Sequence, residues 1–411
     1  MPPRLAKWSV IGIQSIESKL ALRFARLVFQ VAAHGFRSSL VSNIAPATKT
    51  LAVRKARQTR LPAMAEPSGQ RLTVSSDAAK RKRAPLRPSA SILILSPTNQ
   101  VLLLHRVQTS TSFASAHVFP GGNLSPLHDG GPLDPEAPDA HQDSELYRLA
   151  AVRETFEESG LVLARHRDSG APLRLAPDVI AAGRAAVHAN RVRFPDWLAA
   201  VGAVPDTPAL VPFTRWITPP SMPARFSTQM YLYALPPRES ESDSESILPT
   251  TDGGLEHTAA AFADPRAWLA RARSGRVVLF PPQFYLLHLV ADFLTGPPPP
   301  GWAGAPAAHY QAQRDALTAF LRAPPQPVGG RGGEAEAIPW AEKVISPSVL
   351  FTRRGDGRVV LGLEKPGPEL AGIGRGGDWE RVVLVRFGEG GPSEVEVRWR
   401  EEVVREEREK L

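Results

Sequence analysis

The sequence predicts an α/β fold, and three of its features carry that prediction. Two short aliphatic runs, Ile92–Leu95 and Val101–His105, are separated by Pro97–Gln100 and are typical of strand, turn and strand. A helical pattern rich in glutamate then lies between glycine turns and runs up to Gly160. Further strand and helix patterns alternate after it. With 43% hydrophobic residues, the chain of 411 residues has ample apolar material for a core.

The start and the end of the glutamate-rich helix are both marked in the sequence. Ahead of it, Phe119–Gly122 is expected to end a strand and turn the chain. Asp143 or Ser144 suits the N-cap, because a short polar side chain accepts hydrogen bonds from free backbone N–H groups. Gly160 suits the C-terminal end, where a positive φ angle is needed. Leu161–Leu163 is then expected to begin the next strand.

The rest of the chain continues this alternation and ends in a β-rich segment. Helices are expected over Pro177–Asn190, Asp264–Ala272, Pro281–Leu294 and His309–Leu321. Strands are expected over Leu210–Ile217, Phe226–Ala234 and Val277–Phe280. After a Pro/Gly-rich break, alternating apolar and polar residues predict a small antiparallel β addition over Val344–Phe351, Val359–Leu363, Arg381–Phe387 and Glu394–Trp399.

Three carboxylates of the glutamate-rich helix are expected to lie together. Glu154, Glu157 and Glu158 are spaced i, i+3 and i+4, so they project from one face. They repel one another unless a positive charge lies among them, and hard divalent cations such as Mg²⁺ or Mn²⁺ take oxygen ligands of this kind. The run is therefore a candidate metal site. The alternative is an exposed acidic helix in which Arg153 is the i, i+4 partner of Glu157.

The run from Glu145 to Leu161 reads E-L-Y-R-L-A-A-V-R-E-T-F-E-E-S-G-L. It resembles the signature of the Nudix hydrolase superfamily, G-x5-E-x7-R-E-U-x-E-E-x-G-U, in which U is aliphatic. Every fixed position in the run matches except Thr155, which stands where an aliphatic residue is usual. Upstream, 22 residues separate Gly122 from Glu145 where the family has five. This extra segment, Asn123–Ser144, is rich in Pro, Asp, Gly and His and is expected to be a surface loop excursion.

The resemblance implies a mixed-sheet α/β/α sandwich with the metal helix against the sheet, and hydrolysis of a diphosphate with Mg²⁺ or Mn²⁺ as cofactor. It makes Glu157 and Glu158 metal ligands and Glu154 a ligand or the general base. Arg153 is expected to hold the glutamates in place by bidentate pairing. Gly122 lets the backbone approach closely.

Two further acids belong to the expected site. Glu145 is assigned a supporting role or a contact to metal through water, with a first-turn glutamate favoured by the helix dipole as the equal alternative. Glu256 is the candidate for an acid that arrives from a distant loop. Pyrophosphate substrates also need cations, and four side chains in or beside predicted strands are candidates to bind them: Arg106, His117, Arg215 and Arg225.

Other stretches narrow the resemblance to the peroxisomal and mitochondrial branch that hydrolyses coenzyme A and acyl-CoA. They are Thr214–Pro220, Ala224–Thr228 and Phe280–Leu287, with a partial echo in Leu103–Arg106 and His117. This likeness spans Ser91 to Leu294, about half of the chain. It implies cleavage of CoA or acyl-CoA to a phosphopantetheine product and adenosine 3′,5′-bisphosphate. The alternatives are another nucleoside diphosphate derivative (an ADP-sugar, a dinucleotide or an RNA cap) and a catalytically inactive Nudix-fold binding module.

The expected division of the chain follows from these assignments. Residues 1–63 form a basic leader and 64–88 a disordered linker. The Nudix domain covers 89–322, with mobile loops at 123–144 and 238–250. A Pro/Gly-rich linker, 323–340, leads to a β-rich C-terminal extension, 341–411.

The charge of the chain is concentrated at its N-terminal end. Residues 1–87 hold 17 Lys or Arg and 3 Asp or Glu, so the whole-chain net charge of +8 leaves −6 for residues 88–411. This balance does not favour nucleic-acid binding by the folded part. A nucleic-acid role for the basic leader is a weaker alternative, which predicts that residues 88–411 alone would be inactive. A small-molecule substrate is the expected partner.

The basic leader suggests a mitochondrial transit peptide. In residues 1–65 Glu17 is the sole acid, and apolar residues share one helical face: Ile16, Leu20, Phe24, Leu27 and Val31. Met64 as the start and Lys80–Arg83 as a nuclear signal are alternatives. The C-terminal Glu409-Lys410-Leu411 is a poor copy of the peroxisomal Ser-Lys-Leu address, and a cytosolic location is also open.

The length of the apolar runs and the absence of cysteine exclude further classes of protein. No run reaches the roughly 18–20 apolar residues that a membrane span needs, so an integral membrane protein is not expected. The chain has no cysteine, which excludes disulfides, thiolate metal ligands and cysteine nucleophiles.

Overall fold

A computed structural model describes residues 84–108, 115–131, 134, 137, 140–236, 249–251, 256–324 and 338–410. The expected leader lies outside the described residues, as do residues 64–83 of the linker and residues 238–248 of the acidic loop. Among the described residues, no helix combines the length and the apolar character needed to cross a bilayer.

A mixed sheet forms the centre of the described structure. Its strands are β1 (Leu86–Leu95), β2 (Val101–Arg106), β3 (His117–Val118), β4 (Gly121–Asn123), β7 (Val211–Ile217), β8 (Arg225–Ala234), β9 (His257–Ala263) and β10 (Val344–Ile345). They are ordered β10-β7-β8-β1-β2-β3, with β4 paired to β1 and β9 paired to β2. β1 is parallel to β8 and antiparallel to β2 and β4.

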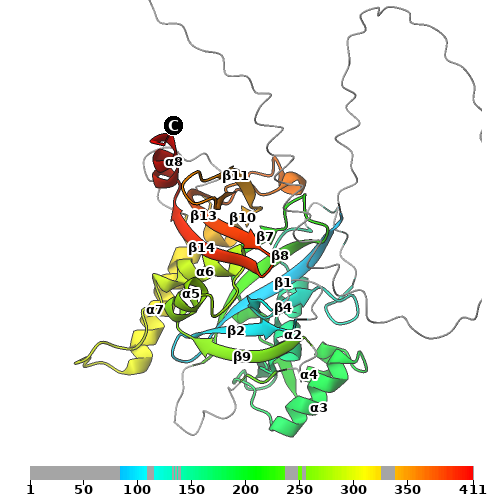
Figure 1. Ribbon diagram of the computed structural model, residues 1–411. Helices are drawn as coiled ribbons and strands as arrows, with labels where there is room; N and C mark the ends of the chain where they lie inside the picture. Colours follow the sequence, from blue (N-terminus) through cyan, green and yellow to red (C-terminus); the bar gives the residue numbers. More distant parts are fainter. Residues whose placement is uncertain are drawn as a thin grey trace, which may run out of the picture.

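Helices cover both faces of this sheet. Successive strand residues point to opposite sides, so the strands present apolar side chains to both layers of helices. Ile92 and Ile94 of β1 lie in one core, and Leu93 and Leu95 in the other. The first face, here the α2 face, bears α2 (Glu145–Ser159), α3 (Pro177–His188) and α4 (Phe194–Ala200) (Figure 1). The second, the α5 face, bears α5 (Pro265–Arg273), α6 (Pro281–Ala291) and α7 (Pro306–Arg322). The expected α/β/α sandwich with a mixed sheet is confirmed.

A second, antiparallel sheet near the C-terminus packs against the helices of the α5 face. It consists of β11 (Ser348–Thr352), β12 (Val359–Leu363), β13 (Asp378–Gly388) and β14 (Gly391–Trp399), followed by α8 (Arg400–Arg408). Leu361, Val383 and Val395 belong to the same buried cluster as Phe284 of α6. Tyr285 of α6 donates a hydrogen bond to Asp378. The β addition therefore shares the core of the central sheet.

Short elements complete the described structure. β5 (Ala164–His166) and β6 (Ala203–Pro205) form a two-stranded ribbon, and the 3-10 turns are η3 (Thr207–Ala209), η6 (Trp340–Glu342) and η7 (Pro368–Leu370).

Most expected elements are present, but several differ, and β9 and α4 were not expected. β1 starts at Leu86 rather than Ile92, because Leu86–Leu95 pairs along its whole length with β8. Gly121–Asn123 is a strand rather than a turn. The strand after α2 begins at Ala164, and the expected strand Val277–Phe280 is reduced to one bridge between Val278 and Ala116. The run Val344–Phe351 divides between the two sheets, and α8 was not expected.

Candidate active site

Helix α2 is held firmly at both ends. Ser144 occupies the N-cap position without a side-chain capping bond, while Asp143 accepts hydrogen bonds from Arg148 and from the hydroxyl of Tyr231 (2.6 Å). At the other end Gly160 has a φ angle of 71° and donates its N–H to Phe156 O at 3.0 Å. A positive φ at this position favours glycine, so the helix ends where the sequence indicates.

Glu158 meets the glycine strand β4. Its Oε2 accepts the N–H of Gly121 at 2.7 Å, and the side chain is buried. Burial raises the pKa of Glu158 well above its ordinary value, and the nearby Glu154 raises it further. A cation bound here would offset both effects, because it stabilises the ionised carboxylate.

Glu154 lies against Gly122. A Cβ atom on Gly122 would stand 2.6–2.7 Å from the carboxylate atoms of Glu154, so any side chain here would displace that carboxylate. Burial raises the pKa of Glu154 to about 7; the Arg153 charge opposes the rise, and Glu157 adds to it. The expected close approach of the backbone at Gly122 therefore has a specific partner, the carboxylate of Glu154.

Arg153 is buried and joins the glutamates to the segment before α2. Its Nη1 donates to Glu154 Oε1 at 2.8 Å and to Glu157 Oε1 at 2.9 Å. Its Nε and Nη2 each donate at 2.9 Å to one oxygen of Asp129, and Nη2 also donates to Asn123 O. Burial alone would lower the pKa of Arg153, but Glu154, Asp129 and Glu157 together raise it. The bidentate partner is thus Asp129, which sequence reasoning missed.

The expectation that Asn123–Ser144 is a surface loop excursion is wrong for part of this segment. His128, Asp129, Ala140 and His141 are buried. His128 accepts the N–H of Phe194 at Nδ1 (3.1 Å), and its Nε2 lies 2.8 Å from Asn190 Oδ1. Asp129 and His128 thus tie the described part of the segment to α2 and to the α3–α4 connection, because buried polar groups need hydrogen-bond partners.

Glu157 faces a third side of the cluster. One carboxylate oxygen bonds Arg153, and the other lies 3.3 Å from Nδ1 of His188 on α3. Arg184 of α3 donates to the backbone O of Glu157 at 2.6 Å. α3 therefore fixes both the side chain and the backbone at this position.

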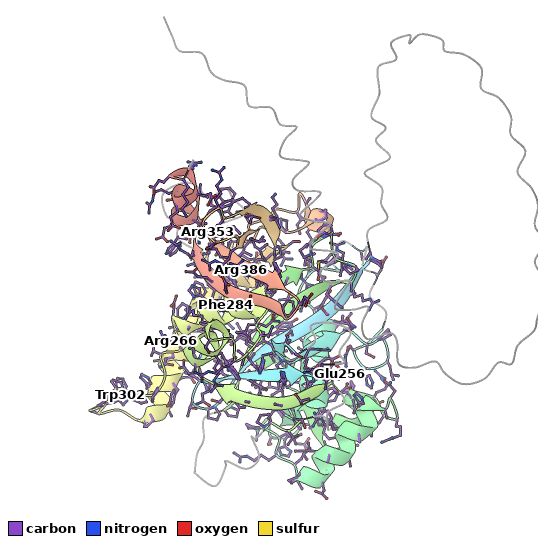
Figure 2. All side chains as sticks on the ribbon, viewed as in Figure 1. Glu256, Arg266, Phe284, Trp302, Arg353 and Arg386 are labelled. Atoms are coloured by element: carbon purple, nitrogen blue, oxygen red, sulfur yellow. The ribbon has the colours of Figure 1, made fainter. Side chains whose placement is uncertain are left out.

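Glu256, labelled in Figure 2, directly precedes β9, and His257 is the first residue of this strand. Both belong to the cluster. Ligand atoms of Glu158, Glu256 and His257 lie within 4.8 Å of one another. Nε2 of His257 is 3.7 Å from Glu158 Oε1. Glu256 also lies 3.5 Å from Nη2 of Arg106, at the end of β2. Sequence reasoning selected Glu256 and Arg106 but missed His257, although it directly follows Glu256.

Glu145 does not join the carboxylate cluster. It lies nine residues before Glu154, about 13 Å along the helix axis at 1.5 Å per residue. Its Oε1 accepts the hydroxyl of Thr207 at 2.6 Å. This contact fits a supporting role, in which Glu145 ties the start of α2 to η3.

Three expected substrate-binding residues lie elsewhere. His117 lies on the α5 face, with ring centroids 4.6 Å from His105 and 5.8 Å from Trp268 of α5. Arg215 is fully buried, stacks on Tyr147 and donates to Gln142 O at 2.9 Å and Ser227 Oγ at 3.0 Å.

Arg225 is also buried, and it pairs with both oxygens of Glu369 at 2.6 and 3.0 Å. The structure therefore gives Arg215 and Arg225 structural partners, and it brings neither to the carboxylates. Arginines within the buried strands of a mixed sheet need such partners, because an unpaired charge is costly there.

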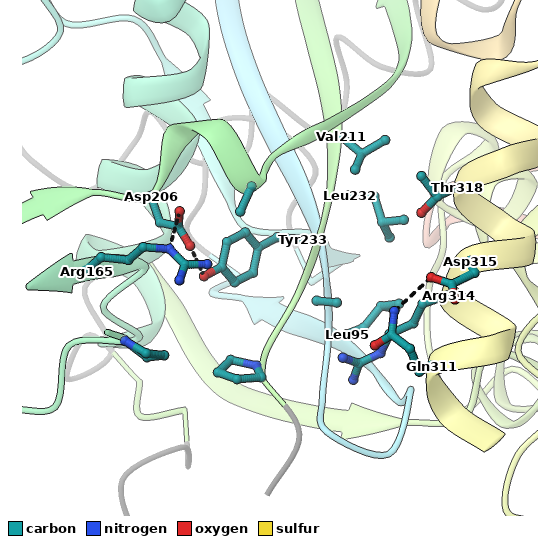
Figure 3. A pocket seen from close by; sticks show the side chains of 14 residues that line it. Leu95, Arg165, Asp206, Val211, Leu232, Tyr233, Gln311, Arg314, Asp315 and Thr318 are labelled. Carbon is teal, nitrogen blue, oxygen red and sulfur yellow. Dashed lines mark hydrogen bonds and ion pairs between the residues drawn. The ribbon is translucent and has the colours of Figure 1, made fainter. Parts of the chain in front are cut away.

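A pocket of about 320 Å³ lies apart from the carboxylates, at the ends of β1 and β8 beside α7 (Figure 3). Arg165, Asp206 and Tyr233 line one side: Arg165 lies 2.8 Å from Asp206, which also accepts the Tyr233 hydroxyl at 2.9 Å. Gln311 and Asp315 of α7 line the other side. None of the α2 carboxylates lines this pocket.

The clustered carboxylates on one helix, fixed by an arginine and by a glycine strand, define a site suited to hold divalent cations against a diphosphate. Residues 134–290 match the family model described as NUDT19 Nudix domain. The chain carries a Nudix hydrolase domain that resembles the acyl-coenzyme A diphosphatase branch of this superfamily.

Curated relatives agree with this family match. The acyl-coenzyme A diphosphatase NUDT19 of Gallus gallus is 29% identical over 191 residues, covering 42% of this chain and 47% of the relative. The Homo sapiens protein of the same name is 26% identical, covering 47% and 61%. The putative nudix hydrolase 7 of Caenorhabditis elegans is 29% identical, covering 49% and 59%. The chain thus spans about half of the length of the curated relatives it matches.

Among solved structures, a NUDIX hydrolase from Alicyclobacillus acidocaldarius matches 49% of this chain and 90% of its own, with 26% identity and a TM-score of 0.39.

Proposed function

We propose that the chain is a divalent-metal-dependent diphosphatase that hydrolyses the pyrophosphate bond of coenzyme A or acyl-CoA. The observation that carries this proposal is the cluster of Glu154, Glu157 and Glu158 on α2, in which Glu158 is buried and the half-buried Glu154 and Glu157 pair with the buried Arg153. Three carboxylates on adjacent turns, of which Arg153 pairs with only two, have an excess of negative charge, which a divalent cation offsets. The CoA assignment is supported by the similarity to the acyl-coenzyme A diphosphatases of Gallus gallus and Homo sapiens.

The donor set fits Mg²⁺ or Mn²⁺. All three helix side chains offer oxygen atoms, which both ions accept. When bound, the cation would neutralise the diphosphate oxygens and lower the pKa of a coordinated water. Glu157 and Glu158 would hold it, and Glu154 would be a further ligand or the base that takes the proton of water. The N–H of Gly121 keeps Glu158 oriented by its 2.7 Å bond.

The proposed reaction consumes one water. The water oxygen forms a bond to one phosphorus of the diphosphate, and the bond from that phosphorus to the bridging oxygen breaks. The products are a phosphopantetheine, acylated or not, and adenosine 3′,5′-bisphosphate, with release of a proton.

Arg153 acts in this proposal as a positioning residue. Its two bonds to Asp129 anchor the guanidinium, and the remaining nitrogen orients Glu154 and Glu157 together. A planar, permanently charged fork is suited to this task, since it binds several carboxylates in a fixed geometry. Of the four side chains expected to bind substrate, Arg106 contacts the carboxylate cluster, through Glu256 at 3.5 Å.

The test is hydrolysis of CoA, acyl-CoA, ADP-ribose, NADH and capped RNA with Mg²⁺ or Mn²⁺. Glu157→Gln removes one carboxylate charge without changing the shape of the side chain. Glu389→Gln, on an exposed loop, is the matched control. Release of adenosine 3′,5′-bisphosphate from CoA by the parent and the control, but not by Glu157→Gln, is the expected result.

Two other outcomes lead to different conclusions. Metal-dependent cleavage of ADP-ribose, NADH or capped RNA without cleavage of CoA would keep the diphosphatase and reject the CoA assignment. Metal binding without turnover of any substrate would favour a Nudix-fold binding module.

A further inference from the structure

The pairing of β2 with β9 contains an irregularity beside the carboxylates. From Val101 opposite Ala263 to His105 opposite Ala259 the strands pair residue by residue. The next residue, Arg106, pairs with His257, so Thr258 is passed over. This is a β-bulge, which bends a strand and re-aims its side chains.

The bulge turns His257 to the α2 face. Ala260 and Phe262 pack in the core of that face, so regular alternation would place residue 258 there and residue 257 on the α5 face. Thr258 instead lies 2.6 Å from Nδ1 of His105, whose ring contacts His117 on the α5 face. His257 consequently approaches Glu158 of α2.

The separation of His257 from Glu158 fits two ligands of one ion. The 3.7 Å between Nε2 and Oε1 is longer than a hydrogen bond. Ligand atoms about 2.1 Å from an octahedral ion lie about 3 Å apart when adjacent and about 4.2 Å apart when opposite. Glu256 supplies the third donor, with all three ligand atoms within 4.8 Å of one another.

The same group has a route for an ion to enter. The side chains of His257 and Glu158 are buried, whereas that of Glu256 is 52% exposed. Two inner ligands and one outer ligand therefore connect the cluster to solvent, as a site that exchanges its ion requires.

We propose that His257 is a nitrogen ligand of the cation at the diphosphatase centre, and that Glu158, Glu256 and His257 form a site that prefers Mn²⁺ to Mg²⁺. This inference rests on the proposed function and adds the identity of the cation and of one ligand. Imidazole suits transition-metal ions, whereas Mg²⁺ takes oxygen ligands and gives up its water reluctantly.

The first experiment needs no variant. Mn²⁺ is added to the metal-stripped full-length chain, and electron spin echo spectroscopy records coupling of the manganese electrons to ¹⁴N. Histidine coordination is expected to give that coupling. A spectrum of the wild-type complex without ¹⁴N coupling would overturn the proposal.

Two histidine variants then locate the nitrogen. His257→Gln is expected to abolish the ¹⁴N coupling and to weaken Mn²⁺ binding by about tenfold or more, with a smaller change for Mg²⁺. His188→Gln tests the other imidazole near the carboxylates, which lies 3.3 Å from Glu157. Loss of the coupling in His188→Gln and its retention in His257→Gln would reject His257 as the ligand.

Controls separate this inference from a folding defect and from the proposed function. His166→Gln, in β5, should bind Mn²⁺ as the wild type does, and circular dichroism should show that His257→Gln remains folded. If His257→Gln does not fold, the wild-type and His188→Gln spectra still show whether a nitrogen binds the ion and whether it belongs to His188. Hydrolysis of a diphosphate without ¹⁴N coupling would reject only the ligand assignment, and ¹⁴N coupling without any hydrolysis would reject only the diphosphatase.

Discussion

The two faces of the central sheet each carry a histidine at the same end, in opposite electrostatic surroundings; His257 is buried and His117 is half-buried. On the α2 face His257 lies beside Glu158 and Glu256. On the α5 face His117 lies between His105 and the helix α5, and burial together with the charges of His105 and Arg271 lowers its pKa to about 4. The charges of the neighbouring side chains therefore distinguish the two sites: carboxylates surround His257, whereas cationic or imidazole side chains surround His117.

The largest expected effect is on the α2 face. Glu158→Gln removes a carboxylate that accepts the Gly121 N–H, and loss of one charge from the cation site should lower kcat/KM for the diphosphate by about 100-fold or more. Thermal unfolding should change little, because glutamine can still accept that hydrogen bond. His117→Gln, on the α5 face, should keep its activity. Equal losses of activity in both variants would show that the activity does not depend on the α2 face more than on the α5 face.

The second prediction concerns the anchor of the α2 face. Asp129→Asn leaves Arg153 without its bidentate carboxylate in a buried position, which should cost about 3 kcal/mol of unfolding free energy and lower kcat. Asp143→Asn, at the more exposed pair with Arg148, should cost about 1 kcal/mol or less. Urea unfolding measures both values. A cost for Asp129→Asn as small as that for Asp143→Asn would show that Arg153 does not depend on this anchor.

A single methyl group gives a third, smaller test. Gly122→Ala would place Cβ 2.6 Å from the carboxylate of Glu154, so this side chain must move. We expect a loss of about tenfold in kcat with little change in KM, since such displacements of catalytic groups are costly. Gly388→Ala has no atom within 4 Å of the added Cβ and should behave as the wild type. Unchanged kinetics in Gly122→Ala would mean that the position of Glu154 is not critical.

The smallest expected effect is a pH dependence that originates on the α5 face. His117 takes up its proton at about pH 4 when folded and at about 6.5 when unfolded. Between these values the unfolded state binds more protons, so the stability contributed by neutral His117 is present above pH 6.5 and is lost as pH falls toward 4. Urea unfolding at several pH values should show this slope, and His117→Gln should reduce it. An identical slope in the variant would assign the effect to other groups.

How far the site could be predicted depends on how local its contacts are. The cluster of Glu154, Glu157 and Glu158 follows from helical spacing, because all three lie within two turns of one helix. Asp129 was missed because it lies within an insertion whose composition is typical of a loop, far in sequence from its partner Arg153. His257 was missed because no strand was expected over His257–Ala263, and the bulge that turns its side chain to the α2 face leaves no mark in the sequence.

The misassigned arginines give the same lesson. Arg215 and Arg225 were expected to bind substrate because cations in strands near the site suit a diphosphate. Their partners, Gln142 O and Glu369, come from segments distant in the sequence, and only the tertiary structure brings them together. Many of the strands and helices follow from hydrophobic periodicity, whereas the α/β/α arrangement of the fold was implied by the resemblance to Nudix hydrolases.

The short strand β10 has a consequence for any shortened form of the chain. β10 pairs with β7, and Arg215 N donates to Lys343 O at 2.9 Å, so the segment after residue 338 closes the open margin of the sheet. A fragment that stops at residue 322 would present the backbone of β7 to other molecules and would leave Arg225 without Glu369. An edge strand with unpaired N–H and C=O groups can pair with a strand of another molecule. We therefore expect removal of the C-terminal segment to favour self-association through the exposed backbone of β7.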